Sequence, residues 1–206
     1  NFSFLKEFGF NEENALSMYF PNTYEVYWDI LPDDFRKKMK NYFKSFWNQK
    51  RLNLAKAIKL NPKEIYILAS IVQKESVKNE EKNRIAGVYI NRLRRNMKLQ
   101  ADPTVIYAIK KLNNNYNRII KRVLYRDLKI ESLYNTYRYK GLPPGPISMP
   151  DISSIEAVLN YEKHDYLYFV VSPSKKGYHL FSKSLNKHNE NKKKYTSWLN
   201  KNKIYR

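Results

Sequence analysis

Glu75 is the residue whose type and spacing best fit catalytic chemistry. It follows Ile71 by four residues and Val72 by three, so the three side chains share one face of the helix predicted there. A carboxyl group on an apolar face loses contact with water, and near the end of a helix it also faces the negative end of the dipole. Both effects favour the protonated form. A carboxylic acid that keeps its proton near neutral pH can act as a general acid.

The same spacing also fits a structural glutamate. A glutamate at a frayed helix end, or one paired with a nearby cation such as Arg84, gives the same pattern. Structural ion pairs perturb carboxylates as well. The pattern alone therefore leaves both interpretations of Glu75 open.

The helix that carries Glu75 has clear start signals. Asn61 can cap it, Pro62 suits its first turn, and Glu64 has the spacing of a capping box. Asp102 before Pro103 gives a similar cap signal for a later helix.

Periodicity elsewhere predicts a mainly helical α+β fold with one small antiparallel sheet. Helices are expected at about residues 12–20, from Asp33 to Trp47, and at 51–60, 118–128 and 184–200. Another helix is expected to end at Asn96, and a further one to begin with a capping box formed by Ser153 and Glu156. A short strand is expected at 24–30, and a hairpin pairs 166–171 with 178–181. Phe2, Phe4, Phe8 and Phe10 are expected to pack. Residues 1–60 should lie against a core of 61–206 in one continuous domain.

Composition excludes several classes of chemistry. The chain has no cysteine, which rules out disulfides, thiolate catalysis and cysteine-bound zinc. Its three histidines lack the spacing of a zinc motif, so neither a metal nor a cofactor is expected. No apolar run approaches the length of a membrane span. The chain begins at Asn1 without a methionine, and we expect it to be a piece of a longer protein.

A formal net charge of +20 suggests an anionic partner, which could be nucleic acid, a membrane surface or an anionic polymer. Lysine and arginine are spread over nearly every predicted helix, and no nucleic-acid recognition motif is present, so nucleic acid is not favoured. The densest segment, Lys183–Arg206, holds eight Lys or Arg against one acid, Glu190. A drift of composition toward Lys and Asn explains it as well as a binding role does.

Five segments are similar in sequence, and in their order along the chain, to segments of one protein family. They are FPNTYEV (Phe20–Val26), LASIVQKES (Leu68–Ser76), INRLRRNMKLQADPTVIYA (Ile90–Ala108), YNTYRYKGLPPGPIS (Tyr134–Ser148) and HLFSKSLNKHN (His179–Asn189). Together they resemble the endolytic murein transglycosylase family, the YceG-like proteins. The resemblance covers nearly the whole chain from Phe20.

The resemblance implies an architecture as well as an activity. Members have a short cytoplasmic start, one membrane helix, a small LysM-like module and a catalytic domain that faces the cell wall. This chain matches the catalytic domain only. A single-pass protein of the bacterial inner membrane is implied, with this domain on the extracytoplasmic, periplasmic side and with cell-wall synthesis proteins as partners.

The implied reaction cuts nascent glycan strands between N-acetylmuramic acid and N-acetylglucosamine and leaves a 1,6-anhydro end. Ordinary glycosidases use two carboxylates. One suffices here because the sugar's own C6 hydroxyl attacks the anomeric carbon, with the advantage of an intramolecular reaction. Glu75 matches the family's catalytic glutamate and would act first as acid and then as base. Gln73 replaces an acid of the family pattern, which leaves Glu75 as the only carboxylate between Glu64 and Glu80.

Several further residues are candidates for binding the glycan. Gln100 could hold an N-acetyl group or orient Glu75, and Asp102 is either a helix cap or a second carboxylate of the site. Aromatic rings and an amide at Tyr134, Asn135 and Tyr137 suit a sugar ring and its acetamido group, although the two tyrosines also fit a core. The rigid segment around Pro143 and Pro144 is expected to shape the wall of the cleft.

Two other functions fit the residues. One is a lysozyme-like muramidase in which Glu75 is the acid and Asp102 positions a water molecule. The other is a non-catalytic, basic module that binds the cell wall or another polyanion.

Overall fold

The computed structural model describes residues 5–6, 8–120 and 122–202. Its elements, with 3-10 helices marked η, are η1 (Ala15–Met18), α2 (Pro32–Phe46), α3 (Gln49–Ile58), α4 (Pro62–Glu75), α5 (Asn79–Arg94), α6 (Asp102–Leu112), η2 (Asp127–Lys129), α7 (Ile152–Leu159), β1 (Tyr168–Val171), β2 (His179–Ser182) and α8 (Leu185–Lys201). The predicted α+β fold, mainly helical with one small antiparallel sheet, is confirmed over these residues. None of the helices described is long and apolar enough to cross a lipid bilayer.

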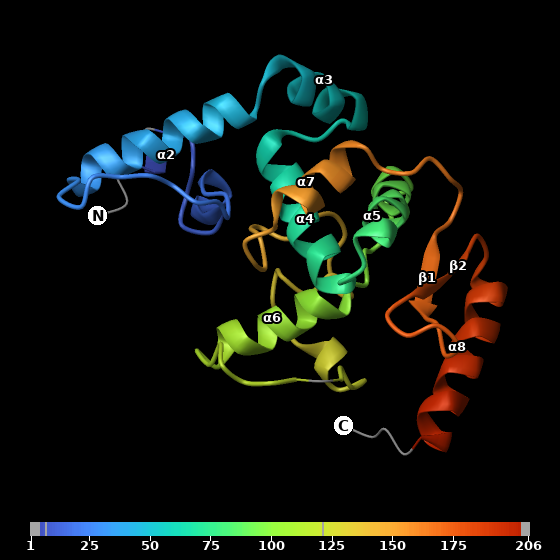
Figure 1. The fold of residues 1–206 in the computed structure, drawn as a ribbon. Helices are drawn as coiled ribbons and strands as arrows, with labels where there is room; N and C mark the ends of the chain where they lie inside the picture. The colour runs from blue at the N-terminus through green and yellow to red at the C-terminus, as the bar shows by residue number, and fades with distance from the viewer. Residues whose placement is uncertain (1–4, 7, 121, 203–206) are drawn as a thin grey trace.

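Helix α4 lies at the centre of the molecule, where it contacts α5 and α7, and above α6 in Figure 1. Every residue from Ile65 to Val72 is buried, so this helix is surrounded by protein on all sides. A helix in that position must be apolar around its whole circumference. The predicted capping box is confirmed, because the Asn61 side chain accepts from the Lys63 and Glu64 amides while Glu64 accepts from the Asn61 amide at 2.7 Å.

The predicted hairpin is also confirmed. Strands β1 and β2 are antiparallel, with Tyr168 opposite Ser182 and Val171 opposite His179. A buried polar contact joins the hairpin to α5, with 2.9 Å between His179 Nδ1 and Glu81 Oε2. Helix α8 packs along the hairpin (Figure 1) and is fixed there by the Asn191 amide, which donates to Ser182 Oγ at 3.0 Å.

The first sixty residues contact the centre of the fold at several points. Phe20 stacks on the aromatic side chains of α2 and meets the ring of Tyr66 in α4. Tyr66 Oη donates to the carbonyl of Tyr19 at 2.6 Å. Of the four phenylalanines expected to pack, Phe10 is buried and Phe8 partly buried, while Phe2 and Phe4 lie outside the described residues. A boundary at residue 60 stays a prediction.

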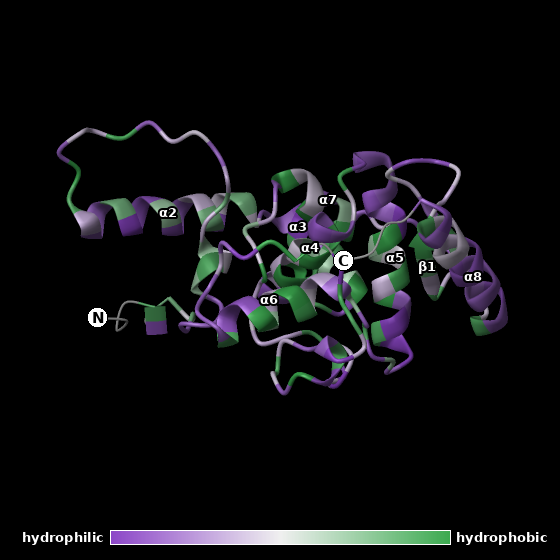
Figure 2. Cartoon of the chain, turned by 90° about the horizontal axis from the view of Figure 1, so that it is seen from below, coloured by the Kyte–Doolittle hydropathy of each residue, from purple (hydrophilic) through white to green (hydrophobic). Residues whose placement is uncertain are grey.

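Two predicted elements are wrong. The strand expected at 24–30 is irregular chain, and Figure 2 shows it looping away from α2. Tyr27 is 85% exposed and Trp28 98% exposed, so the alternation of residues buries neither face and no neighbouring strand pairs with it among the described residues. The helix expected at 118–128 is also irregular over its described residues, except for the turn η2, which Asp127 stabilises by accepting from the Leu124 amide.

Two helix starts also differ from prediction. The chain near residue 12 forms only the short 3-10 helix η1, which begins at Ala15. Helix α7 is capped at Asp151 and not at Ser153, and it has no side-chain cap bond. Glu156, expected to complete a capping box, instead pairs with Arg51 of α3 at 2.7 Å. An ion pair between two helices that are far apart in sequence therefore forms in place of the expected local capping box.

Helix α5 packs closely on the segment after α7 at Gly87, so a substitution at this position tests the packing. A Cβ atom at this position would lie 2.5 Å from the carbonyl oxygen of Glu162 and 2.6 Å from His164 Nε2. We expect Gly87→Ala to lower the free energy of unfolding by about 1–3 kcal/mol through this overlap. Helix propensity alone would favour alanine by about 1 kcal/mol. Denaturant unfolding separates the two, since a variant as stable as the wild type would contradict the packing described.

Candidate active site

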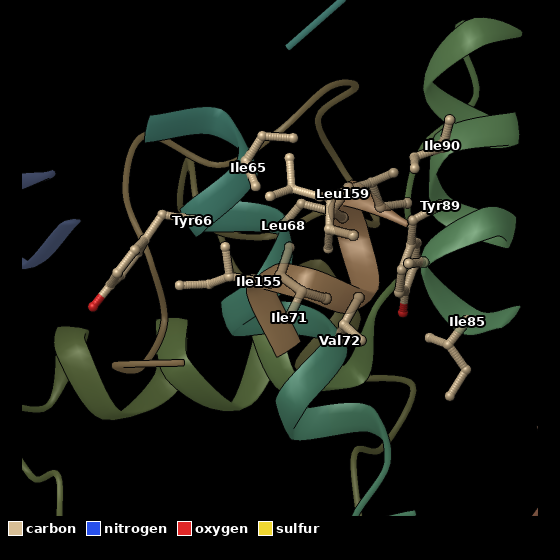
Figure 3. Packing of buried hydrophobic residues seen from close by; sticks show 14 of the residues in the cluster. Ile65, Tyr66, Leu68, Ile71, Val72, Ile85, Tyr89, Ile90, Ile155 and Leu159 are labelled. Carbon is tan, nitrogen blue, oxygen red and sulfur yellow. The ribbon is translucent and has the colours of Figure 1, made fainter. Parts of the chain in front are cut away.

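Glu75 is the last residue of α4, where the buried helix reaches the edge of the core. Its carboxylate is partly buried and accepts a hydrogen bond from Tyr89 Oη, with 2.6 Å between Tyr89 Oη and Glu75 Oε1. Figure 3 shows the Tyr89 ring on the face of α5 that meets α4, in the same packed layer as Val72. Arg84 pairs with Glu162 at 2.9 Å, so the structural pair between Arg84 and Glu75 does not form.

The surroundings of Glu75 favour its protonated form. Burial raises the pKa of Glu75 from its ordinary value of 4.5 to about 7. The hydrogen bond from Tyr89 and the positive charge of Arg92 lower the pKa, while the negative charge of Asp102 raises it. Loss of hydration is the largest of these effects. At neutral pH the carboxyl group therefore exchanges readily between its two protonation states.

Arg92 of α5 holds three parts of the chain around Glu75. Its side chain is buried, with Nε donating to the carbonyl of Leu167 at 2.6 Å and Nη1 donating to the carbonyl of Leu99 at 2.7 Å. The Gln100 amide oxygen lies 3.4 Å from the same Nη1. Because the guanidinium is committed to these partners, Arg92 supplies a fixed positive charge near Glu75.

Thr136 joins the two loops that border the site. Its carbonyl accepts from the Gln100 amide at 3.1 Å, and its Oγ1 accepts from the Ala101 amide at 3.0 Å. The hydroxyl also lies 2.9 Å from Thr104 Oγ1. Gln100 itself is in the left-handed region, with φ +50°, which is uncommon for a residue with a side chain. These bonds hold that backbone conformation in place and leave the Gln100 side chain exposed.

Asp102 is not the helix cap that the sequence predicted. The N-cap of α6 is Ala101, and the Asp102 carboxylate makes no cap bond. It accepts from Tyr137 Oη instead, at 2.6 Å. Burial raises the pKa of Asp102, while the bond from Tyr137 and the charge of Lys192 lower it. Asp102 and Tyr137 thus form a hydrogen-bonded pair within electrostatic reach of Glu75.

Tyr134 and Asn135 point their polar groups into the protein. Asn135 is fully buried, and its amide donates to the carbonyls of Leu128 and Ile130 at 3.0 and 2.8 Å. Tyr134 is 3% exposed and donates to Glu13 Oε2 at 2.5 Å. Both side chains hold the loop that presents Tyr137. Their predicted role in substrate binding stays a prediction.

Pro143 and Pro144 lie beside the other end of α4. They line a hollow of about 670 Å³ together with Asn61 and Ile67. Ile67 precedes Glu75 by eight residues, which corresponds to about 12 Å along a helix. The structure therefore does not bring the two prolines to Glu75, although the Ile147 amide that follows them donates to Ser70 Oγ of α4 at 3.1 Å.

Three residues of the site were missed by sequence reasoning. Neither Tyr89 nor Arg92 was singled out as a residue of the site, and Thr136 stands between two residues that were. Arg92 follows Tyr89 by three residues on the buried face of α5, and a cation at such a position was the available signal. The described residues contain no group of three or more His, Asp or Glu side chains placed to hold a metal ion.

The chain is similar to known proteins in sequence and in fold. The profile of the YceG-like family matches residues 4–194. An endolytic murein transglycosylase of Bacillus subtilis is 38% identical over 164 residues, which are 80% of this chain and 42% of that protein. One from Streptococcus pneumoniae is 41% identical over 56% of this chain and 20% of its own length. A crystal structure of a YceG-like protein from Listeria monocytogenes, 35% identical, superposes with a TM-score of 0.64 over 82% of this chain and 51% of that one.

The raised pKa of Glu75 has a consequence for stability. A carboxyl group with a folded-state pKa near 7 binds its proton more tightly than in the unfolded chain, so stability falls as pH rises from about 4.5 to 7. The amide introduced by Glu75→Gln keeps an acceptor for Tyr89 but never ionises. We therefore expect this substitution to raise the free energy of unfolding by about 1–3 kcal/mol at pH 8 and by almost nothing at pH 4.

Denaturant unfolding at both pH values measures this difference. Glu131→Gln removes the same charge from a side chain that is 80% exposed and controls for the change in net charge. Equal effects of Glu75→Gln at the two pH values would contradict the environment described for Glu75.

Proposed function

The chain belongs to the YceG-like family, and from that premise we propose that it cleaves murein glycan strands as an endolytic lytic transglycosylase. The chain spans less than half the length of the two transglycosylases named above, so the activity of the whole protein belongs to this proposal. The observation that carries it is the state of Glu75, a partly buried carboxyl group with a pKa of about 7, beside a tyrosine donor. That is the state a single catalytic carboxyl group needs.

In the first step Glu75 acts as a general acid. Its proton passes to the oxygen that links N-acetylmuramic acid to N-acetylglucosamine, and the bond from that oxygen to the anomeric carbon breaks. Oε1 accepts from Tyr89, so we assign the proton to Oε2. As Glu75 becomes an anion, the bond from Tyr89 strengthens and the charge of Arg92 stabilises it.

In the second step the Glu75 carboxylate acts as a base. It accepts the proton of the C6 hydroxyl while the C6 oxygen bonds to the anomeric carbon of the same sugar. The 1,6-anhydro ring closes, no water is consumed, and Glu75 regains its proton. A pKa near the working pH serves both steps, because one group must give and then take a proton.

The side chains around Glu75 suit a sugar ring. The Tyr137 ring is partly exposed and the Gln100 side chain is exposed, which offers a stacking face and a hydrogen-bonding group for an acetamido substituent. Asp102 retains an oxygen beyond the one that Tyr137 occupies, and a sugar hydroxyl can donate to it. Hydrogen bonds to Thr136 hold the loop that contains Gln100 against the loop that contains Tyr137.

Murein lies outside the cytoplasmic membrane, so the proposed activity places this domain on the extracytoplasmic side. The membrane anchor, the LysM-like module and the partners in wall synthesis stay predictions.

A second candidate is hydrolysis of the same bond. It is favoured by one observation, the presence of Asp102 within electrostatic reach of Glu75, because paired carboxylates are the usual equipment of hydrolases. In that mechanism Asp102 would position a water molecule, and the product would have a reducing end in place of the anhydro ring.

The products decide between the two reactions. Digestion of uncrosslinked glycan strands, followed by mass spectrometry, is expected to give ends one water lighter than reducing ends. Glu75→Gln should lower the rate by about 10²–10⁴-fold, because it removes the acid and base. Asp102→Asn serves as the comparison and should still give anhydro ends. Reducing ends from the wild type, or full activity of Glu75→Gln, would overturn the assignment.

The pH dependence of the rate reports the charge balance around Glu75. Activity should fall as pH rises through about 7, where Glu75 loses its proton. Tyr89→Phe removes a bond that lowers the pKa of Glu75, so this limb should move to higher pH. Asp102→Asn removes a negative charge that raises the pKa, so the limb should move to lower pH. Profiles of kcat/KM against pH that move together, or not at all, would contradict these roles.

A further inference from the structure

The hairpin turns one face toward α5 and the other toward α8, and Figures 1 and 2 show it between these two helices. Side chains alternate along a strand, so Phe169 shares a face with Phe181, its partner in the register, and with His179 two residues before that partner. Tyr168 belongs to the opposite face, where its ring stacks on His188 of α8 with 5.2 Å between the ring centroids. The face toward α5 is therefore aromatic.

Phe169 contacts the tyrosine that binds Glu75. The rings of Phe169 and Tyr89 meet edge to face, with 5.8 Å between their centroids and 84° between their planes. Tyr89 is fully buried, and its hydroxyl makes one hydrogen bond among the described residues, the bond to Glu75. Because no second hydrogen bond fixes the hydroxyl, the direction of the ring depends on the side chains that pack against it.

Phe169 is held in turn by His179. These two rings also meet edge to face, with 5.3 Å between their centroids and 85° between their planes. Glu81 of α5 fixes His179 at two points, since Oε1 accepts from the His179 backbone amide at 3.0 Å and Oε2 lies 2.9 Å from Nδ1. Both of these side chains are buried. The contacts form one continuous series, which is Glu81, His179, Phe169, Tyr89 and Glu75.

The hairpin and the chain that leads into it are attached to α5 on either side of this aromatic contact. Glu81 precedes Tyr89 by eight residues, which corresponds to about 12 Å along a helix. Arg92 follows Tyr89 by three residues and donates to the carbonyl of Leu167 at 2.6 Å. The two attachments fix the position of β1 along α5. Phe169 lies between them, as part of a surface that cannot slide along the helix.

We propose that Phe169, fixed in place by His179, is a positioning residue for the reaction at Glu75, because it holds the Tyr89 ring in the orientation that directs its hydroxyl to Glu75 Oε1. This inference rests on the proposed function and deepens it. The hydroxyl is at the far end of the ring, so a small rotation about the Cα–Cβ bond displaces it strongly. A hydrogen bond weakens steeply as its angle departs from the optimum. Small displacements caused by residues away from the reacting atoms can therefore be costly to catalysis.

A different role for Phe169 would be packing alone. In that case Phe169→Leu would lower the free energy of unfolding without affecting the titration of Glu75. A positioning role predicts that the pKa of Glu75 rises, because the bond from Tyr89 lowers it and a loosely held ring forms that bond less well. Leucine keeps an apolar side chain against Tyr89, so the burial of the carboxyl group is retained.

The titration of Glu75, followed by carbon-13 NMR of its carboxyl carbon, tests this role. We expect Phe169→Leu to raise the midpoint by about 0.3–1 pH unit, since the hydrogen bond is weakened and not removed. The alkaline limb of kcat/KM should move to higher pH by the same amount. In a Tyr89→Phe background the same substitution should leave the midpoint where it is, because no hydroxyl remains to be misplaced.

Val170→Ala is the matched control. Val170 lies on the opposite face of β1, opposite Leu180, so its truncation weakens the hairpin without removing the contact to Tyr89. The midpoint should stay unchanged, and denaturant unfolding compares the stability lost by the two variants. His179→Gln leaves Phe169 in place but removes the ring that holds it, and a smaller rise of the midpoint is expected. Phe169→Leu changes no charge, so it carries the test.

An unchanged or lower midpoint in Phe169→Leu, an equal rise in Val170→Ala, or a rise that persists in the Tyr89→Phe background would overturn the proposal. No rise in His179→Gln would overturn the part assigned to His179. Because the titration does not depend on cleavage, the two proposals fail separately. Cleavage of glycan strands without the rise counts against the positioning role alone, whereas the rise without cleavage supports the positioning of Tyr89 and counts against the proposed reaction.

Discussion

The hydrogen bond from Tyr89 to Glu75 is the contact on which the rest of this site depends. It joins the end of the buried helix α4 to the inner face of α5, at the point where the core gives way to solvent. Burial pushes the Glu75 carboxyl toward its protonated form, while Tyr89 and Arg92 keep the anion accessible. A group that must both release and recover a proton needs this balance, which neither full exposure nor an apolar pocket would provide.

The surrounding structure serves to keep that balance fixed. Arg92 ties α5 to the chain before β1 and to the loop before α6, and Thr136 ties that loop to the segment that presents Tyr137. These bonds are made largely to backbone groups, which move less than side chains. They also hold Gln100 in a conformation that an isolated loop would rarely adopt. The site is therefore built from segments far apart in sequence but locked together by a few polar side chains.

Much of the fold was predictable because its signals are local. The capping box at Asn61, the apolar face that leads to Glu75 and the hairpin at residues 168–182 each follow from short-range patterns. The strand expected at 24–30 failed because alternation also occurs in exposed chain that finds no partner strand. Asp102 does not cap α6 as expected, because its carboxylate accepts a hydrogen bond from Tyr137, which lies 35 residues later in the chain. Proline restricts the backbone locally, but the position of Pro143 and Pro144 at the other end of α4 from Glu75 is a tertiary property that sequence does not contain.

The proposed reaction requires Glu75 to hold its proton near neutral pH, and the titration of this carboxyl group can be observed directly. Carbon-13 NMR of protein labelled at the glutamate side-chain carboxyl carbon, with the Glu75 signal assigned by its absence in Glu75→Gln, follows that group alone. A midpoint close to pH 7 is the result that the structure predicts. A midpoint near 4.5, the ordinary value for a glutamate, would mean that Glu75 is ionised at neutral pH and cannot be the proton donor proposed.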